Sequence, residues 1–419
     1  MEDRKSYKEE KLGNYIVDIA AGPFGSNLKV DCFVSDGFPI IDGANLKGFK
    51  VTDNITKFVT EEKARSLHRS IAKRNDVVVT ISGNVGQISF IPMDSRYPEY
   101  LVSQRQFRVT FDEKRVYVPY LVYYFHTIEG QHKILSFANQ TGVPALAQPL
   151  KNFRNIDICL PNLKTQKNIA KILEALDDKI ALNNRINHNL EEQAQALYKS
   201  WFVDFEPFEG GKFVDSELGM IPEGWRVLPF LSVARLCSGG TPKTDQKEFW
   251  NGSIPFFTPK DVGDSAFCLS TEKTITEEGL KNCNSSLYKA FTTFITARGT
   301  VGKLCMAGVP MAMNQTNYAI CPASNIDVIT LFLITKQLIN SLRNKANGAV
   351  FDAITTRDFD GEKVTIAPQG VMDTFSSVVH PIYESILQNE MKNASLSQLR
   401  DSLLPKLMSG DFITSDIPC

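Results

Sequence analysis

Two stretches of the chain carry apolar residues at the seven-residue spacing of paired helices. The first, residues 166–202, has no glycine or proline and would form a helix of roughly 55 Å. The pattern returns 206 residues later, in residues 370–412, so we predict two long coiled-coil helices. One row of the repeat is Ile169, Leu176, Asn183, Leu190 and Leu197 in the first helix and Phe375, Ile382, Asn389, Leu396 and Leu403 in the second; the other row of the first helix is Leu173, Ile180, either Ile186 or Asn187, Ala194 and Trp201.

The polar residues Asn183 and Asn389 occupy equivalent positions in these two rows. A buried asparagine in such a core costs stability but fixes the register and the partner. We hypothesise that both lie near the middle of an antiparallel, pseudo-twofold helix pair, where replacing both with leucine would raise thermal stability. The alternative is that one or both face solvent. Pro381, which stands where the first helix has Ala175, either kinks the second helix or starts a new one.

Outside the long helices, short β-rich runs alternate with helical spacing and with turns rich in glycine, proline and asparagine. This mixture predicts α/β domains with short elements. The expected strands lie within residues 76–82, 106–111, 291–297 and 317–321, and the expected helices within residues 118–128 and 328–339.

The two halves of the chain also repeat each other. When the chain is shifted by 216 residues, eleven of the 48 positions in residues 39–86 are identical without a gap, whereas about three would match by chance at average composition. A period this long describes two similar domains, not a solenoid. We therefore expect an α+β protein with two similar mixed α/β domains, joined by two long antiparallel coiled-coil helices. The expected segments are a first domain (1–160), a central helix (161–204), a connector (205–224), a second domain (225–369) and a C-terminal helix (370–412).

The charge, apolar runs and cysteines of the chain exclude several classes of protein. The formal net charge is −1 over 419 residues, which is unlike a generic basic nucleic-acid binder. Residues 1–160 and 221–368 are slightly basic (+3 and +2), and the helical segments between and after them are acidic, so polyanion binding would be local or shared with a partner. The chain has no apolar run of membrane-spanning length. The charged N-terminus and the eight scattered cysteines indicate a cytoplasmic protein without a signal peptide, disulfide framework or metal site.

Catalytic motifs are missing from the sequence. There is no phosphate-binding GxxxxGK[ST], no HExxH, no nucleophile elbow and no aspartate cluster with metal spacing. A catalytic subunit acting alone is therefore disfavoured, and so is a purely structural adaptor, because two large domains accompany the helices. A recognition protein remains.

The chain resembles the specificity subunits of Type I restriction–modification systems over essentially its whole length. Residues 238–262, SGGTPKTDQKEFWNGSIPFFTPKDV, are similar to the opening of a target recognition domain in that family. Residues 22–29 and 37–47 are similar to a variant opening, and residues 166–186 and 399–410 resemble the two conserved helices.

The resemblance implies a function without catalysis. Each domain would recognise one half of a bipartite sequence in double-stranded DNA, and the helices would set the spacer and bind two methylation subunits. Two restriction subunits could join the complex. S-adenosylmethionine and ATP with Mg²⁺ would belong to those partners, with no cofactor or metal in this chain and no contact with a membrane. The alternative is a DNA-binding scaffold of the same fold in another phage-defence complex.

Candidate DNA-binding residues are polar side chains expected on loops, because amide, guanidinium and hydroxyl groups recognise base edges and cations contact phosphates. Residues that differ between the two copies, such as Arg298 against Ser82 and Lys243 against Asn27, are the better candidates for base choice. Glycines near them either permit close approach of DNA or form turns. The candidates are Ser26, Asn27, Lys29, Asn45, Lys47, Ser82, Asn84, Gln87, Gln104 and Arg105 in the first domain, and Thr241, Lys243, Lys260, Arg298, Thr300, Lys303, Asn314, Gln315 and Asn317 in the second.

Overall fold

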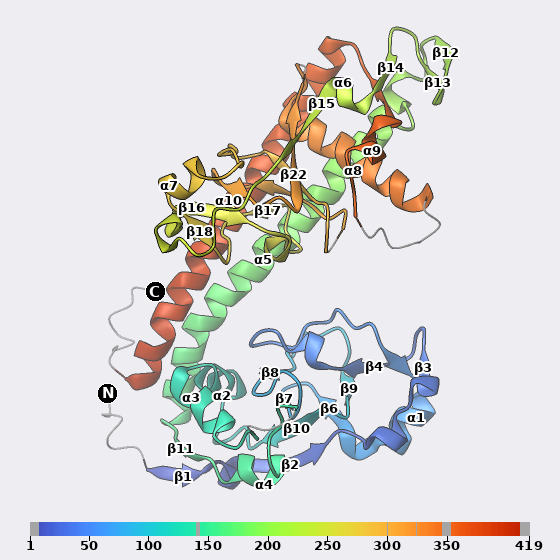
Figure 1. Ribbon diagram of the computed structural model, residues 1–419. Helices are drawn as coiled ribbons and strands as arrows, with labels where there is room; N and C mark the ends of the chain where they lie inside the picture. Colours follow the sequence, from blue (N-terminus) through green and yellow to red (C-terminus); the bar gives the residue numbers. More distant parts are fainter. Residues whose placement is uncertain (1–7, 140–142, 300, 324, 346–352, 411–419) are drawn as a thin grey trace. The chain divides into compact units, whose positions relative to one another are not determined.

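The computed structural model describes residues 8–139, 143–299, 301–323, 325–345 and 353–410 (Figure 1). The chain forms two compact units. Unit 1 consists of residues 1–178 and 396–419, and unit 2 consists of residues 179–395. Each unit thus contains one mixed α/β domain together with one part of each long helix.

The domain of unit 1 is built on two sheets. One has the strand order β2-β10-β7-β8, the other has the order β3-β5-β4-β9-β6, and β1 pairs with β11. The strands are β1 (Glu9–Lys11), β2 (Ile16–Ala21), β3 (Phe33–Val34), β4 (Phe38–Ile41), β5 (Phe58–Val59), β6 (Ile71–Lys73), β7 (Val77–Thr80), β8 (Ile88–Phe90), β9 (Glu99–Val102), β10 (Gln106–Phe111) and β11 (Asp157–Cys159). The helices are α1 (Glu61–Ser66), α2 (Val118–Phe125), α3 (Ile128–Leu135), α4 (Pro149–Arg154) and the start of α5 (Leu163–Phe202).

The surroundings of strand β7 explain why its residues are all apolar and do not alternate with polar ones. Val77 and Val79 belong to a core cluster that also contains residues of α2 and the long helices, including Leu121, Leu173 and Leu404. Val78 points to the opposite face and belongs to a separate cluster with residues of the second sheet. Both faces of the strand are therefore covered, as expected for a continuous run of β-branched residues.

The domain of unit 2 has the corresponding plan, with a five-stranded sheet in the order β15-β22-β19-β20-β17 and a three-stranded sheet in the order β18-β16-β21. Strand β14 pairs with β23, as β1 does with β11 in unit 1. The strands are β14 (Arg226–Pro229), β15 (Ala234–Ser238), β16 (Trp250–Phe257), β17 (Phe267–Cys268), β18 (Thr274–Ile275), β19 (Thr293–Thr296), β20 (Leu304–Ala307), β21 (Ala312–Met313), β22 (Asn317–Pro322) and β23 (Lys363–Ile366). The helices are α6 (Phe230–Val233), α7 (Glu277–Lys281), α8 (Val328–Lys345), α9 (Arg357–Asp360) and α10 (Gln369–Ser409).

The residues expected to connect the two copies are more ordered than their glycine, proline and acid content suggests. They contain a hairpin formed by β12 (Phe213–Ser216) and β13 (Gly219–Pro222). Upstream of the hairpin, the rings of Phe205 and Phe208 lie 5.3 and 5.1 Å from the ring of Trp225. This aromatic cluster holds the segment against the domain.

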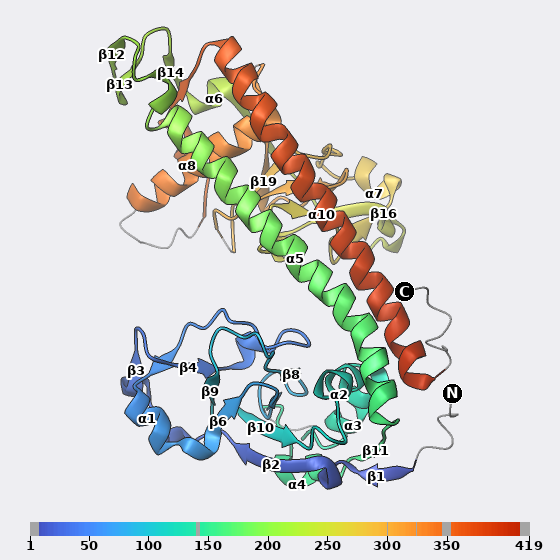
Figure 2. The ribbon, with the colours of Figure 1, turned by 180° about the vertical axis from the view of Figure 1, so that it is seen from behind.

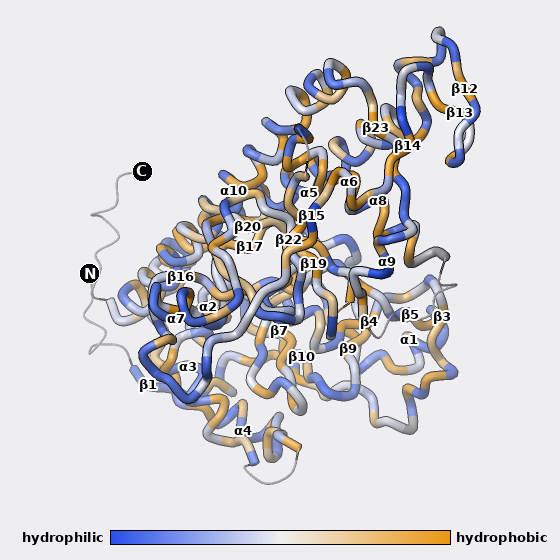
Figure 3. Tube along the Cα trace, turned by 45° about the horizontal axis from the view of Figure 1, so that its top comes forward, coloured by the Kyte–Doolittle hydropathy of each residue, from blue (hydrophilic) through white to orange (hydrophobic). Residues whose placement is uncertain are grey.

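The predicted long helices are confirmed as α5 and α10, and they pack antiparallel within each unit. In unit 2 the C-terminal part of α5 lies beside the N-terminal part of α10, where the rings of Phe202 and Phe375 are 4.8 Å apart (Figure 2). Hydrophilic and hydrophobic residues alternate along α10, as expected for a helix with a buried stripe (Figure 3). No second helix begins at Pro381, because α10 continues through it.

Asparagines pair across the helices, but Asn183 and Asn389 do not pair with each other. The amide of Asn183 donates to Asn393 at 2.8 Å, and that of Asn389 donates to Asn187 at 2.8 Å. The two pairs are equivalent under the internal repeat. In the second row of α5, Asn187 is the buried residue and Ile186 is 40% exposed. Replacing Asn183 and Asn389 with leucine would therefore leave Asn393 and Asn187 without these partners, so we expect a loss of thermal stability where a gain was predicted.

A carboxyl group near the middle of α10 makes the stability of unit 2 pH-dependent. Glu390 lies close to Ser265 and Phe267, and burial raises the pKa of its carboxyl to about 7. The folded state therefore favours the protonated acid, so this group's stabilising contribution is full below its ordinary pKa and is lost as the pH rises through 7.

We expect Glu390→Gln to remove this dependence, because glutamine is neutral at every pH. Relative to the native protein, the variant should gain about 2 kcal/mol between pH 5 and pH 8. Denaturant unfolding at both pH values measures this gain. The exposed Glu223, changed to glutamine, is the matched control and should show no such gain. A constant difference for Glu390→Gln at both pH values would contradict the prediction.

Among the described residues, no helix is long and apolar enough to span a bilayer. The same residues contain no group of three or more His, Cys, Asp or Glu side chains arranged to hold a metal ion.

Candidate nucleic-acid interface

A cavity of about 750 Å³, lined by both polar and apolar residues, opens in the first domain at one end of β4, β7 and β10. Its wall is formed by these strand ends, by the loops next to them, and by Leu28, Val30 and Phe33 from the segment between β2 and β4. Six of the predicted DNA-binding residues line it: Lys47, Ser82, Asn84, Gln87, Gln104 and Arg105.

Main-chain hydrogen bonds bring these loops together. The N–H of Ile81 donates to the carbonyl of Arg105 at 2.7 Å, and the N–H of Ser103 donates to the carbonyl of Ile41 at 2.9 Å. A third bond joins Gly22 to Gln106 at 2.8 Å. A Cβ atom on Gly22 would lie 1.9 Å from the carbonyl oxygen of Ser103, so only glycine fits there.

The cavity wall carries uncompensated positive charge. Lys47 and Arg105 are exposed and form no ion pair with any described residue, whereas Lys57 pairs with Asp42 at 2.7 Å. Exposed cations without acidic partners attract a polyanion, and the amides between them provide donors and acceptors for base edges.

The remaining first-domain candidates differ in their surroundings. Asn27 and Lys29 are exposed on the loop that starts at Gly22 but do not line the cavity, and the side chain of Ser26 lies outside the described residues. The prediction that Asn45 binds DNA is wrong. It is 4% exposed, its amide donates to the carbonyls of Thr52 and Asn54, and its oxygen accepts from the Asp42 N–H. Its hydrogen-bonding groups thus hold the local turn.

The second domain assembles its loops with the same main-chain bonds. The N–H of Ala297 donates to the carbonyl of Thr316 at 3.0 Å, and the N–H of Asn314 donates to the carbonyl of Phe257 at 3.0 Å. A Cβ atom on Gly239 would lie 2.3 Å from the carbonyl of Asn314, which repeats the constraint at Gly22. The repeat therefore preserves this loop framework and not only the strands.

The candidate DNA-binding residues of the second domain differ in how exposed they are. Exposed positions are occupied by Thr241, Lys243, Lys260, Arg298, Lys303 and Gln315. Thr241 hydrogen-bonds to Gln315, and Lys303 lines a smaller cavity of about 250 Å³. Thr300 lies outside the described residues.

Two asparagines of the second domain are directed inward. Asn317 is fully buried, and its amide donates to the side-chain oxygen of Asn314 at 2.6 Å. The same oxygen of Asn314 also accepts from the hydroxyl and N–H of Thr316. The prediction that Asn317 binds DNA is therefore wrong, because a buried side chain cannot reach a base. The side-chain oxygen of Asn314 is engaged in hydrogen bonds that shape the loop.

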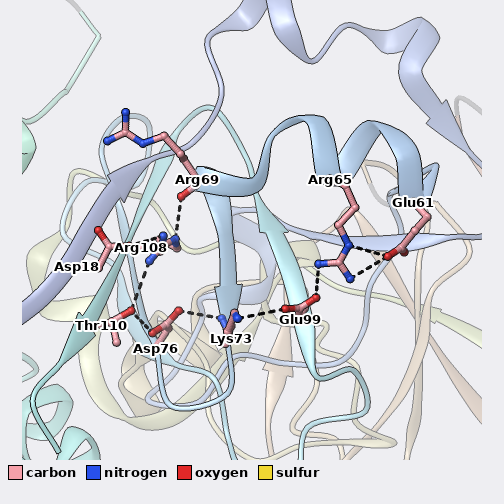
Figure 4. Close-up of polar contacts among 9 residues, drawn as sticks. All are labelled: Asp18, Glu61, Arg65, Arg69, Lys73, Asp76, Glu99, Arg108 and Thr110. Carbon is pink, nitrogen blue, oxygen red and sulfur yellow. Dashed lines mark hydrogen bonds and ion pairs between the residues drawn. The ribbon is translucent and has the colours of Figure 1, made fainter.

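A charged network supports the first domain at the other end of β7 and β10 (Figure 4). Arg108 is 8% exposed; its guanidinium donates to Asp18 at 2.6 Å and to the carbonyl of Arg69 at 2.9 Å. Asp76 accepts from the Thr110 hydroxyl at 2.6 Å, and burial raises the pKa of this carboxyl. The hydrogen bond from Arg108 lowers the pKa of Asp18. Asp18, Asp76, Arg108 and Thr110 thus form one hydrogen-bonded network at this end of the strands.

Sequence reasoning missed several residues around the first cavity. Thr80 and Ser103 line it but lie at strand ends that a pattern cannot orient. Asp42 and Lys57 also line it, as an ion pair. Phe24 was passed over because apolar residues are normally assigned to cores, yet it is 82% exposed. Its position between the proline and glycine of GPFG is the signal that could have placed it at a loop tip.

Comparison with known proteins identifies the family. A family model described as the Type I restriction modification DNA specificity domain matches residues 30–192 and again residues 222–384. The chain is 26% identical over 365 residues to the Type I restriction enzyme MjaIX specificity subunit of Methanocaldococcus jannaschii, covering 86% of this chain and 82% of that one. It is 25% identical over 318 residues to the HindI specificity subunit of Haemophilus influenzae, covering 62% and 69%.

A solved structure has the same fold. The S subunit of a Type I restriction–modification system from M. genitalium superposes with a TM-score of 0.59 at 13% sequence identity, covering 96% of both chains. The family model matches both copies of the internal repeat, and each copy contains one loop cluster held by the same main-chain bonds. The chain therefore belongs to the Type I restriction–modification DNA specificity family, with two copies of the family's domain.

Proposed function

We propose that each domain recognises one half of a bipartite sequence in double-stranded DNA through its loop cluster. The observation that carries this proposal is that equivalent clusters display different side chains. The Ser82 position of the first is Arg298 in the second, while the main-chain bonds beneath them correspond. A shared framework with different exposed groups suits two different half-sites.

The charges at the two clusters support the same proposal. Lys47 and Arg105 in the first domain and Lys260 and Arg298 in the second are exposed cations without an acidic partner among the described residues. They would contact phosphates or base edges, although the chain as a whole has a net charge of −1. Binding would thus be local to these loops and completed by basic partners.

We further propose that this chain provides specificity and no catalysis. The long helices would set the spacer between half-sites and bind two methylation subunits, which two restriction subunits could join. S-adenosylmethionine, and ATP with Mg²⁺, would be held by those partners. Support comes from family membership, from the lengths of α5 and α10 at 40 and 41 residues, and from the acidic charge of the helical segments.

The test is single-molecule methylation sequencing of the source genome with this reading frame intact and deleted. We expect one split motif, with a methylated adenine in each half, to disappear on deletion. The motif and its spacer would follow directly from the result. An unchanged methylome in cells that produce the methylation subunits would contradict the proposal and favour the scaffold function in another defence complex.

Arg298 is the strongest candidate for base choice in the second domain, because guanidinium groups commonly bind guanine with two hydrogen bonds. We expect Arg298→Ala to relax one base position of the second half-site, at about 1–3 kcal/mol, and to leave the first half-site unchanged. Methylation sequencing of cells carrying the variant measures both. Lys281→Ala, which removes an exposed cation from α7, is the control. An unaltered second half-site would show that Arg298 contacts no base.

A further inference from the structure

The loop at residues 22–29 presents an aromatic ring beside the cavity of the first domain. Phe24 is 82% exposed and Val30, which lines the cavity, is 79% exposed. With Val34, which is 36% exposed, they leave three apolar side chains exposed within residues 24–34. Exposed apolar side chains that gather in one segment are typical of a surface that meets a partner.

Main-chain contacts fix the loop tip that carries this ring. Gly22 is bonded to Gln106 at the cavity wall, and Pro23 and Leu28 are buried on either side of the tip. Within the tip, the N–H of Asn27 donates to the carbonyl of Phe24 at 2.8 Å. Because both ends of the loop are anchored, little backbone conformational entropy would be lost when the ring meets a ligand.

The surroundings of Phe24 favour nucleic acid as that ligand. A Cβ atom on Gly25 would lie 2.8 Å from the Gln104 side-chain oxygen, so the tip adjoins the cavity rim. Lys29, Lys47 and Arg105 add cations without an acidic partner among the described residues. An aromatic ring framed by cations and amides matches the alternation of bases and phosphates in DNA, and apolar side chains in such interfaces insert between base steps.

The second domain differs at the equivalent loop. After Gly239 and Gly240 the chain continues with Thr241, Pro242 and Lys243, and none of the exposed large apolar side chains of the described residues lies there. The aromatic tip therefore belongs to one copy of the repeat and is not required by the shared fold.

We propose that Phe24 is a DNA-contacting residue that stacks on or wedges between bases of the first half-site, with no counterpart in the second. This rests on the proposed function. It predicts that the DNA is distorted asymmetrically, with unstacking confined to the half-site bound by the first domain.

The test uses the full chain with its methylation subunits and duplexes carrying the split motif. 2-Aminopurine is placed in one half-site or the other, away from the methylated adenine, because the methylation subunits would unstack that base themselves. Binding of the native protein should raise fluorescence in the first half-site only, because unstacked 2-aminopurine emits more strongly. Phe24→Ala should abolish that rise and weaken binding about 10- to 100-fold, whereas Phe24→Trp should retain both. Met93→Ala, which truncates a residue that is 69% exposed beyond the far end of β8, is the matched control.

The contrary outcomes are distinct. Native affinity and fluorescence in Phe24→Ala would overturn the proposal. So would unaltered DNA binding with loss of the methylation subunits, which would assign Phe24 to a protein contact. If the native protein does not prefer the split motif to a scrambled duplex, the proposed function itself fails. Melting curves of each variant exclude misfolding, which is not expected for an exposed side chain.

Discussion

A variant with alanine at Lys47, Gln104 and Arg105 should lose at least about 100-fold in affinity for the bipartite DNA site. These residues lie on the wall of the first-domain cavity, and each specific contact is worth about 1–3 kcal/mol. Because recognition requires both half-sites, methylation should disappear from both. Titration of labelled duplex at several salt concentrations measures the loss, and the salt dependence should weaken by roughly two phosphate contacts.

The matched control removes the same charge elsewhere. Lys114 and Lys151 are exposed in the same domain but do not line the cavity, so their double alanine variant should bind nearly as the native protein does. Equal losses in the two variants would mean that only net charge matters, which would contradict recognition by the cavity wall. Unaltered binding in the triple variant would place the interface on another face.

Asn389→Leu should destabilise unit 2 by about 1–3 kcal/mol. The cause is indirect, because the side-chain oxygen of Asn187 loses its donor while Asn187 itself is 6% exposed. Leucine at both positions should recover the loss, since a buried polar group with no partner costs more than a pair of apolar ones. Denaturant unfolding of the native chain, both single variants and the double variant yields the coupling energy.

The second pair, Asn183 with Asn393, provides an internal control because it is equivalent under the repeat. It differs in one respect, since Asn393 also donates to Asn184 at 2.8 Å. With all four asparagines replaced, we expect a more stable helix pair with a less defined register, which cysteine cross-linking between the helices would detect. Additive single-variant losses would show that the paired amides are not coupled.

The sequence predicted the elements whose period is long or whose composition is extreme. The run QFRVTF coincides with β10, and the heptads coincide with α5 and α10 within a few residues. Two-residue strands such as β3 and β5 were out of reach, because they exist only through pairing with distant strands. The partners of Asn183 and Asn389 were equally hidden, since a heptad gives the buried row but not the stagger between helices.

Some residues of the candidate site could likewise be predicted from the sequence and others could not. Most loop residues chosen for polarity are exposed, but Asn45 and Asn317 are buried at turns where their amides satisfy neighbouring groups. Asparagine serves both purposes, and only the three-dimensional neighbours distinguish them. Phe24 was missed for the opposite reason, because its apolar side chain is exposed by a backbone that glycine and proline hold in place.

The main-chain bonds that join the loops have an evolutionary consequence. Since Ile81 and Ala297 are held by backbone carbonyls, the neighbouring Ser82 and Arg298 can be exchanged for other residues at little cost to folding. Under the proposed function, such exchanges would let a lineage change its DNA target through single substitutions, without an unstable intermediate. Because each domain can change independently, the number of possible bipartite targets would be the product of the half-site sequences available to each domain.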